Sequence, residues 1–281
     1  MENPKGRIMI NLNTYRILQW FFQSILKKQR MLMIFKPLLP SPIYGVCNGY
    51  WMELDLDEVI QRSMYLGEYE PEQTEWVKDI LKPGGKFLDV GANVGYYTTL
   101  AASLVGGNGQ VVAFEPSPYA YAKLKTVLKD SKINQVRLFQ SAAGDENGQL
   151  NLYLPIEKYL HSPSLVQSDK SYIPVKVDVF RLESHHALQG LKGIDLMKLD
   201  VEGFEPNVLR GMRTYLQSGR VKYLMCELNS GWLEANGSSC ENLFEMIKDL
   251  GFVVRKETKQ ATIVAPGGLV YRYQDILFQH V

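Results

Sequence analysis

Cysteine is scarce in this chain, with three among 281 residues. The three are Cys47, Cys226 and Cys240, an odd number, and no pair has the CxxC spacing of a zinc or redox site. These features argue against a disulfide framework and against a zinc centre. We therefore expect the protein to work in a reducing compartment, the cytoplasm.

Charge of one sign is also missing, because 31 Lys and Arg are balanced by 30 Asp and Glu, which leaves a net charge of +1. Such a balance gives no global field that would attract nucleic acid or an acidic membrane. Lys123, Lys125 and Lys129 fall on one side of a predicted helix, where we expect a solvated face. No nucleic-acid partner is expected.

The first part of the chain has no long uninterrupted apolar run, so we expect neither a secretory leader nor a spanning helix there. Residues 17–26 are mainly apolar and aromatic, but they include two glutamines and a serine, Arg16 precedes them and basic residues follow within 27–30. Two interpretations stay open: a helical cap over the substrate pocket, and a peripheral contact with a membrane surface. Prolines at positions 37, 40 and 42 then predict the end of an N-terminal helical arm, residues 1–49, before a main domain of residues 50–281.

Short apolar segments alternate with segments of helical periodicity through the main domain. After a first strand that begins at Phe87, further strands are predicted at residues 111–115, 136–140, 196–201 and 221–228. Helices separate these strands, so we predict an α/β fold with a Rossmann-like, doubly wound, mostly parallel sheet. Two added strands at 150–154 and 175–179 flank the polar segment 158–170, a candidate active-site loop.

The most informative segment follows the first strand, where Asp89 leads into a turn with the pattern Gly91-x-Asn93-x-Gly95. An acidic strand end, Glu115, comes 20 residues after Gly95 (115 − 95). From that position in a doubly wound sheet, a carboxylate accepts hydrogen bonds from ribose hydroxyls. The turn lacks the third glycine of a dinucleotide site and a lysine for a triphosphate, so NAD and ATP fit poorly. S-adenosylmethionine fits better, because its ammonium and sulfonium groups suit Asp89 and its single ribose suits Glu115.

Four segments extend this turn into a resemblance to a known family. They are Asp89–Thr98 (DVGANVGYYT), Phe114–Ser117 (FEPS), Ala142–Asp145 (AAGD) and Ile194–Glu205 (IDLMKLDVEGFE). Together they resemble the FkbM-type family of S-adenosylmethionine-dependent methyltransferases over residues 66–279, and the last segment is the most specific. The resemblance implies a class I methyltransferase fold for the main domain and, usually, methyl transfer to a hydroxyl oxygen. The expected acceptor is a small molecule, such as a glycan or a natural-product intermediate.

The donor site is expected at the carboxyl ends of the strands, where an open parallel sheet binds its ligand. Asp89 is expected to hold the amino end of the donor, the glycine turn its methionine part, the Glu115 segment its ribose and the residues from Ser141 onward its adenine. For Asp145 a plain turn cap is the alternative. The predicted donor-binding residues are Glu70, Asp89, Gly91, Asn93, Gly95, Glu115, Pro116, Ser141, Ala142 and Asp145.

Carboxylates follow the next two strands, and they are the candidates for accepting or orienting the acceptor proton. The predicted catalytic residues are Asp200, Glu202 and Glu227. A turn at Gly203 would let Asp200 and Glu202 both approach the pocket. Two alternatives remain: Glu202 could cap the following helix, and Glu227 could be a satisfied carboxylate at a strand end. Lys198 is expected to pair with an acid, or to orient an acceptor carboxylate.

No metal is predicted, because His185 and His186 are adjacent, are expected to point apart as a solvated pair, and lack a third ligand. Three rival functions stay open. The nearest is methylation of nitrogen or of a carboxylate. A non-catalytic module that senses S-adenosylmethionine is the second, although it predicts a degraded motif at Asp200 and Glu202. An NAD oxidoreductase is the third, and the glycine spacing disfavours it.

Overall fold

The computed structural model describes residues 42–155, 172–264 and 270–281. The chain forms two compact units that divide between Glu70 and Pro71, and each is described by itself. Residues 1–41 of the predicted arm and the polar segment 158–170 lie outside the described residues. The lid and membrane interpretations of the arm therefore stay predictions.

The first unit contains a hairpin and one helix. Strands β1 (Ile43–Cys47) and β2 (Tyr50–Leu54) pair antiparallel across a tight turn at Asn48 and Gly49, both with positive φ. Helix α3 (Val59–Leu66) begins where the Glu58 carboxylate accepts two backbone N–H groups, and it ends at Gly67 in the left-handed conformation.

The second unit alternates strands and helices in its first half. In chain order these are α4 (Pro71–Ile80), β3 (Lys86–Val90), α5 (Tyr96–Val105), β4 (Gln110–Phe114), α6 (Pro118–Asp130), β5 (Val136–Phe139), β6 (Ala142–Gly144), β7 (Gly148–Pro155) and β8 (Tyr172–Arg181). A 3₁₀ turn, Leu182–Ser184, then leads to β9 (Ile194–Leu199), α7 (Glu205–Gly211), α8 (Arg213–Gln217), β10 (Val221–Asn229), α9 (Ser230–Ala235), α10 (Cys240–Asp249), β11 (Phe252–Glu257), β12 (Ala261–Val264) and β13 (Val270–His280).

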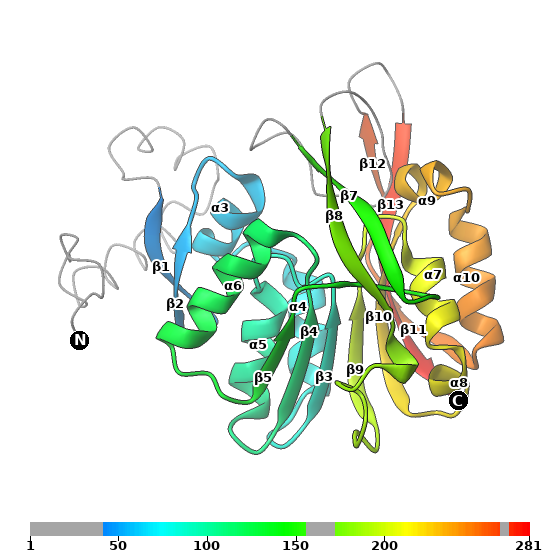
Figure 1. Cartoon of the computed structure of the whole chain (residues 1–281), viewed down its shortest axis with the longest axis horizontal. Helices are drawn as coiled ribbons and strands as arrows, with labels where there is room; N and C mark the ends of the chain where they lie inside the picture. The colour runs from blue at the N-terminus through cyan, green and yellow to red at the C-terminus, as the bar shows by residue number, and fades with distance from the viewer. Residues whose placement is uncertain (1–41, 156–171, 265–269) are drawn as a thin grey trace. The chain divides into compact units, whose positions relative to one another are not determined.

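The main sheet has the strand order β11-β13-β10-β9-β3-β4-β5, with β12 paired to β13 (Figure 1). Strands β5, β4, β3, β9 and β10 are parallel, whereas β13 runs antiparallel to both of its neighbours in that order. The chain winds outward from β3 in one direction through β4 and in the other through β9, so the strand order reverses at β3. The predicted α/β, doubly wound, class I methyltransferase fold is confirmed.

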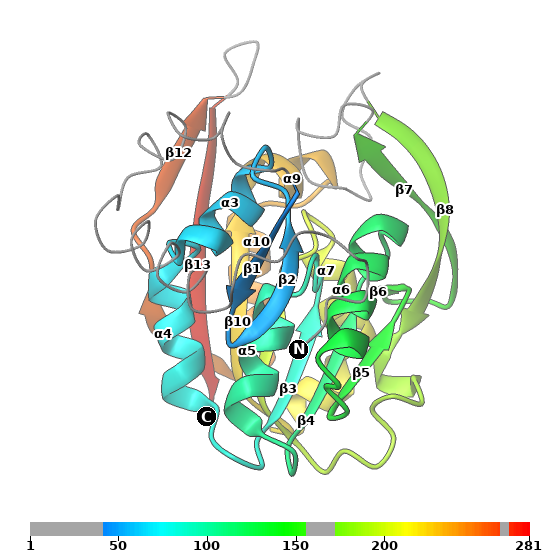
Figure 2. The same ribbon diagram turned by 90° about the vertical axis from the view of Figure 1, so that its left-hand side faces the viewer.

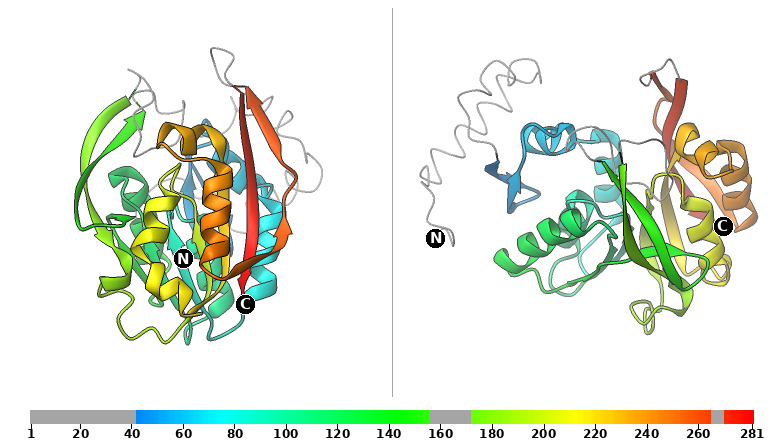
Figure 3. Two further views of the ribbon diagram at one scale, coloured as in Figure 1. Left: turned by 90° about the vertical axis from the view of Figure 1, so that its right-hand side faces the viewer. Right: turned by 45° about the horizontal axis from the view of Figure 1, so that its top comes forward.

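Helices cover both faces of this sheet, as the two side views show (Figures 2 and 3). Helices α4, α5 and α6 lie on one face, and α7, α8 and α10 lie on the other. Side chains alternate between the faces along each strand. On β3, Leu88 and Val90 therefore join the large apolar core beneath α7, α8 and α10, while Asp89 between them turns to the α5 face, where it meets Thr98.

The two added strands predicted at 150–154 and 175–179 are confirmed and longer than expected. As β7 and β8 they pair antiparallel, and β6 joins β8 in parallel to complete a separate three-stranded sheet. Figure 2 shows β7 and β8 as a long curved pair. A small apolar cluster of Ala142, Leu152, Val177 and Val179 holds this sheet together, and it fixes the segment that follows β5. Within the described residues, no helix combines the length and apolar character needed to cross a bilayer.

Candidate active site

The turn after β3 contains two glycines, and other atoms of the protein occupy the space that a Cβ would take at each of them. Gly91 has a φ of +89°, and a Cβ there would lie 1.8 Å from the carbonyl oxygen of Asp200. Gly95 has a φ of +96°, and its Cβ would lie 2.3 Å from Cδ1 of Leu124 on α6. The glycines therefore let the turn after β9 and helix α6 pack tightly against the β3 turn. Their predicted approach to the donor stays a prediction.

Glu115, directly after β4, fastens the β3 turn to its own strand end. One oxygen accepts the Asn93 N–H at 2.7 Å and the other accepts the Ser117 N–H at 2.7 Å. Asn93 has a φ of +49°, and its Oδ1 accepts the Val94 N–H. The Glu115 side chain is only 5% exposed, and burial raises its pKa to about 7 in spite of these bonds. Each carboxylate oxygen retains a second lone pair for a ribose hydroxyl.

Two buried polar atoms near this edge test whether S-adenosylmethionine fits. Asp89 is fully buried, and its Oδ2 accepts the Thr98 hydroxyl at 2.6 Å. Among the residues that the structure describes, neither Asp89 Oδ1 nor the buried Ser141 Oγ has a hydrogen-bond partner. Buried polar atoms are normally satisfied, so an ammonium at Asp89 and a purine edge at Ser141 would each supply the missing bond. The residues present therefore fit this donor.

The remaining predicted donor residues are placed as follows. Asp145 accepts bonds from Arg210 Nε at 2.9 Å and Asn207 Nδ2 at 3.4 Å, and these bonds to α7 lower its pKa against the effect of burial. Ala142 is buried at the start of β6. Pro116 lies next to Ser117, the N-cap of α6. Glu70, with a φ of +41°, ends the first unit. Their contacts with the donor stay predictions.

The end of β9 carries an ion pair. Lys198 Nζ donates to Asp200 Oδ2 at 2.8 Å, and it lies 5.2 Å from the centre of the Tyr97 ring. The expectation that Lys198 pairs with an acid is therefore confirmed. Lys198 also lowers the pKa of Asp89, which burial raises. The same cation thus acts on the strand ends of both β3 and β9.

The chain turns at Glu202 and Gly203, where a turn would let Asp200 and Glu202 both approach the pocket. Glu202 has a φ of +53° and Gly203 a φ of +92°. A Cβ on Gly203 would lie 2.3 Å from the carbonyl oxygen of Trp232 on α9, so this turn is wedged between α9 and the β3 turn. The turn keeps Glu202 at the sheet edge rather than continuing the strand.

Glu205 is a residue that the sequence reasoning missed. Its Oε1 accepts the Val201 N–H at 2.9 Å and the Gly203 N–H at 3.3 Å, and the side chain is 2% exposed. Burial raises its pKa to about 7. Glu202 was considered as a cap for this segment, but the carboxylate that accepts these two N–H groups belongs to Glu205. An acidic residue opening a helix beside a proline was the available signal.

Glu227 on β10 faces several other carboxylates. It pairs in register with Asp275 on β13. Its pKa is raised well above the usual value, first by burial and then by repulsion from Asp200, Glu202, Asp275 and Glu205. Repulsion of this kind favours the form that holds a proton. The structure thus brings the three predicted catalytic carboxylates to one edge.

The two adjacent histidines do not form the expected solvated pair: His186 is exposed, but His185 is buried, so the expectation is wrong for His185. His185 is 7% exposed, its ring centre lies 4.4 Å from that of His186, and it packs against Phe114 and Phe139. The 3₁₀ turn before it breaks the extended conformation on which the expectation depended. Within the described ranges, no group of three or more His, Cys, Asp or Glu has the arrangement of a metal site.

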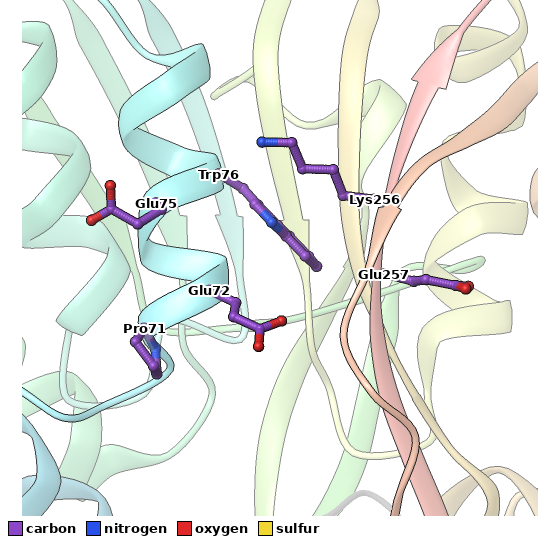
Figure 4. A pocket seen from close by; sticks show the side chains of 6 residues that line it. All are labelled: Pro71, Glu72, Glu75, Trp76, Lys256 and Glu257. Carbon is purple, nitrogen blue, oxygen red and sulfur yellow. The ribbon is translucent and has the colours of Figure 1, made fainter.

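A shallow surface hollow of about 650 Å³ lies between α4 and β11. Figure 4 shows the Trp76 side chain reaching from α4 toward β11, with Lys256 on the opposite side. The lining residues are Pro71, Glu72, Glu75, Trp76, Lys256 and Glu257. None of the predicted donor-binding or catalytic residues lines this hollow, so it is not the candidate site.

Comparison with known proteins gives a family match and several similar proteins. Residues 89–254, more than half of the chain, match the family described as the Methyltransferase FkbM domain. The 2-O-methyltransferase NoeI of Sinorhizobium fredii is 27% identical over 50% of this chain and 63% of its own length. Methyltransferase 1 of Beauveria bassiana is 28% identical over 46% of this chain and 59% of its own length. The matched part of the chain thus spans about three fifths of these curated relatives.

Some solved structures also align with part of this chain, at TM-scores below 0.5. One is the methyltransferase FkbM from Methylobacillus flagellatus, which is 14% identical and aligns with a TM-score of 0.41 over 77% of this chain and 52% of that one. Another is an S-adenosylmethionine-dependent O-methyltransferase from Thermotoga maritima, 14% identical, with a TM-score of 0.42 over 76% of this chain and 66% of that one.

Proposed function

This chain belongs to the FkbM methyltransferase family, whose methyl donor is S-adenosylmethionine, and we propose that it methylates a hydroxyl oxygen of a small molecule such as a glycan or natural-product intermediate. One observation carries the proposal. The Glu115-anchored donor turn, Asp200 and Glu202 follow strands of one parallel sheet, and Glu227 lies near the carboxyl end of its strand β10, so all of them lie at one edge of the sheet. The printed name of the relative NoeI, a 2-O-methyltransferase, favours oxygen as the acceptor atom.

The donor side of this edge is assigned to bind and orient S-adenosylmethionine. Glu115 is held by two backbone N–H groups, so its carboxylate needs no rearrangement to accept ribose hydroxyls. Asp89 Oδ1 and Ser141 Oγ offer buried polar contacts for the amino and adenine ends. S-adenosylmethionine, when bound, supplies a methyl group already activated by a sulfonium. The protein therefore contributes mainly position and exclusion of water.

The acceptor side manages one proton, which a hydroxyl must lose as its oxygen attacks. Asp200 is held in place by the bond from Lys198, so it is suited to orient the hydroxyl. Glu227, whose pKa burial and the neighbouring carboxylates raise, is the stronger base and is assigned to take the proton. Glu202 lies on the turn between them in the chain and completes the same edge.

Two measurements test the proposal. Calorimetry should show binding of S-adenosylmethionine and of its demethylated product, and no binding of NAD. A mass-spectrometric screen should then find the mass gain of one methyl transfer with hydroxyl acceptors. Products only from amines or carboxylates would replace O-methylation with the rival chemistry. Tight donor binding without turnover on any acceptor class would favour a sensing module instead.

A further inference from the structure

The turn between β9 and α7 is a strained element with an internal support. Glu202 is a non-glycine residue with a φ of +53°, and Gly203 follows with a φ of +92°. A positive φ costs free energy at the non-glycine Glu202, and the surroundings must offset that cost, whereas Gly203 adopts such a φ without a steric penalty. The support comes from Glu205, whose Oε1 accepts the N–H groups on both sides of Glu202, from Val201 and from Gly203. One buried oxygen thus fixes the backbone on each side of a proposed acceptor-side residue.

The same turn also contacts the donor turn on one side and helix α9 on the other. The carbonyl of Asp200 lies against Gly91 of the donor turn. The backbone at Gly203 lies against Trp232 of α9, and the Gly203 carbonyl accepts Asn236 Nδ2 at 2.8 Å. These contacts limit how far the turn can move, but they leave the N–H groups of Val201 and Gly203 to Glu205.

We propose that Glu205 is a positioning residue for methyl transfer: its buried carboxylate fixes the turn that presents Asp200 and Glu202 to the acceptor, and its charge adds to that of the other carboxylates around Glu227. The proposal rests on the proposed function for its catalytic part. Glu205 itself is assigned no contact with donor or acceptor, since its oxygen is committed to the turn.

The electrostatic part follows from the groups around Glu227. The groups that face it are Asp200 from the end of β9, Glu202 from the turn, Glu205 from α7 and Asp275 from β13. Each raises its pKa, and the nearby cation Lys198 is paired with Asp200. Removing the charge of Glu205 while keeping its oxygen should therefore lower the pKa of Glu227. A purely structural role for Glu205 predicts no such shift.

Two substitutions of nearly equal volume separate the two roles. Glu205→Gln keeps an oxygen that can accept both N–H groups but removes the charge, whereas Glu205→Met removes the acceptor as well. Glu72→Gln is the matched control, because Glu72 is also an acidic residue in the first turn of a helix, but an exposed one.

We expect Glu205→Met to lower kcat by on the order of tenfold or more, since small displacements of reacting groups are costly, with little change in donor affinity. Glu205→Gln should recover most of that loss and move the acidic limb of the kcat/KM profile to lower pH. The control should resemble wild type. Full activity of Glu205→Met, or an unmoved acidic limb in folded Glu205→Gln, would overturn the proposal.

Hydrogen exchange supplies a readout that does not need turnover. The amides of Val201 and Gly203 should exchange faster in Glu205→Met and near the wild-type rate in Glu205→Gln. Unchanged exchange in Glu205→Met would reject the positioning role even if the protein proves to be an O-methyltransferase. Conversely, if Glu205→Met exchanges faster but the wild-type protein methylates no acceptor, Glu205 supports the turn and the proposed function is rejected. If Glu205→Met does not fold, the pH profile of Glu205→Gln decides alone.

Discussion

The two halves of the site edge use carboxylates in different ways. Next to β3 and β4, Asp89 and Glu115 are almost completely buried, and their bonds come from a threonine hydroxyl and from backbone N–H groups. At the carboxyl ends of β9 and β10, Asp200 and Glu227 are half-buried. Asp200 forms an ion pair with Lys198, and other carboxylates repel Glu227. The carboxylates of the donor half accept hydrogen bonds from groups fixed in the fold, whereas in the acceptor half neighbouring carboxylates repel one another.

This difference matches the work proposed for each half. Binding a ligand of fixed shape benefits from acceptors that do not move, and backbone N–H groups provide that rigidity at Glu115. Accepting a proton instead benefits from a carboxylate with a raised pKa, and at Glu227 burial first, and then the neighbouring carboxylates, raise the pKa. One cation, Lys198, acts on both halves, since it pairs with Asp200 and lowers the pKa of Asp89.

The largest expected effect comes from separating the two halves physically. In Gly91→Ala the new Cβ would lie 1.8 Å from the Asp200 carbonyl, at a φ of +89°. Backbone on one side must move, so we expect a loss of more than about 3 kcal/mol in the free energy of unfolding. Urea denaturation measures it. Gly107→Ala is the control, because nothing lies within 4 Å of its Cβ position. Equal stability of the two variants would disprove the close packing of the turns.

A second substitution removes the charge that the halves share. Lys198→Met leaves Asp200 without its ion-pair partner and Asp89 buried without the nearby cation that lowers its pKa. Losing one partner of a buried pair costs about 3 kcal/mol or more, and the partial exposure of Asp200 reduces this to about 2–3 kcal/mol. Lys222→Met, which removes the exposed pair with Asp195, should cost less than about 1 kcal/mol. A similar loss in both variants would show that Lys198 is not special.

A third substitution tests the donor half alone. Glu115→Ala should weaken S-adenosylmethionine binding by about 1.5–3 kcal/mol, the range for hydrogen bonds to a charged group, and calorimetry measures it. The Asn93 and Ser117 N–H groups also lose their acceptor, so the melting temperature should fall while the fold persists. Glu146→Ala, at an exposed site, is the control. Donor binding as tight as in wild type would remove Glu115 from the ribose site.

Much of the fold and of the donor half could be predicted from the sequence, because those signals are local. Apolar runs and the glycine turn placed Asp89, Asn93 and Glu115 at the carboxyl ends of neighbouring strands, and the strand order confirms that placement. The spacing from Gly95 to Glu115 reflects one helix and one strand, so it depends on no distant contact.

The remainder depends on contacts that no local pattern encodes. Glu205 can bond the turn because the chain turns at Glu202, which has a positive φ, and at Gly203, which packs against Trp232 of α9. His185 is buried because the segment after β8 folds over the ends of β4 and β5, where Phe114 and Phe139 lie. In both cases, segments far apart in the chain decide what one side chain does.

A fourth expected effect is a pH dependence that differs between the halves. Burial raises the pKa values of Glu115 and Glu205 from 4.5 to about 7. Between these values the native state holds more protons than the unfolded state, so stability is full below about 4.5 and is lost as the pH rises through about 7. Each carboxyl contributes less than about 1.4 kcal/mol per pH unit.

Donor binding should change in the opposite direction, because Glu115 accepts ribose hydroxyls best when ionised. We therefore expect S-adenosylmethionine to bind more tightly as the pH rises through about 7, while the donor-free protein becomes less stable. Glu115→Gln should flatten both profiles, and Glu205→Gln only the stability profile, as followed by denaturation and calorimetry across this range. If Glu205→Gln also flattened the binding profile, the two halves would be one coupled titrating group, and the distinction between a rigid donor half and a repelling acceptor half would fail.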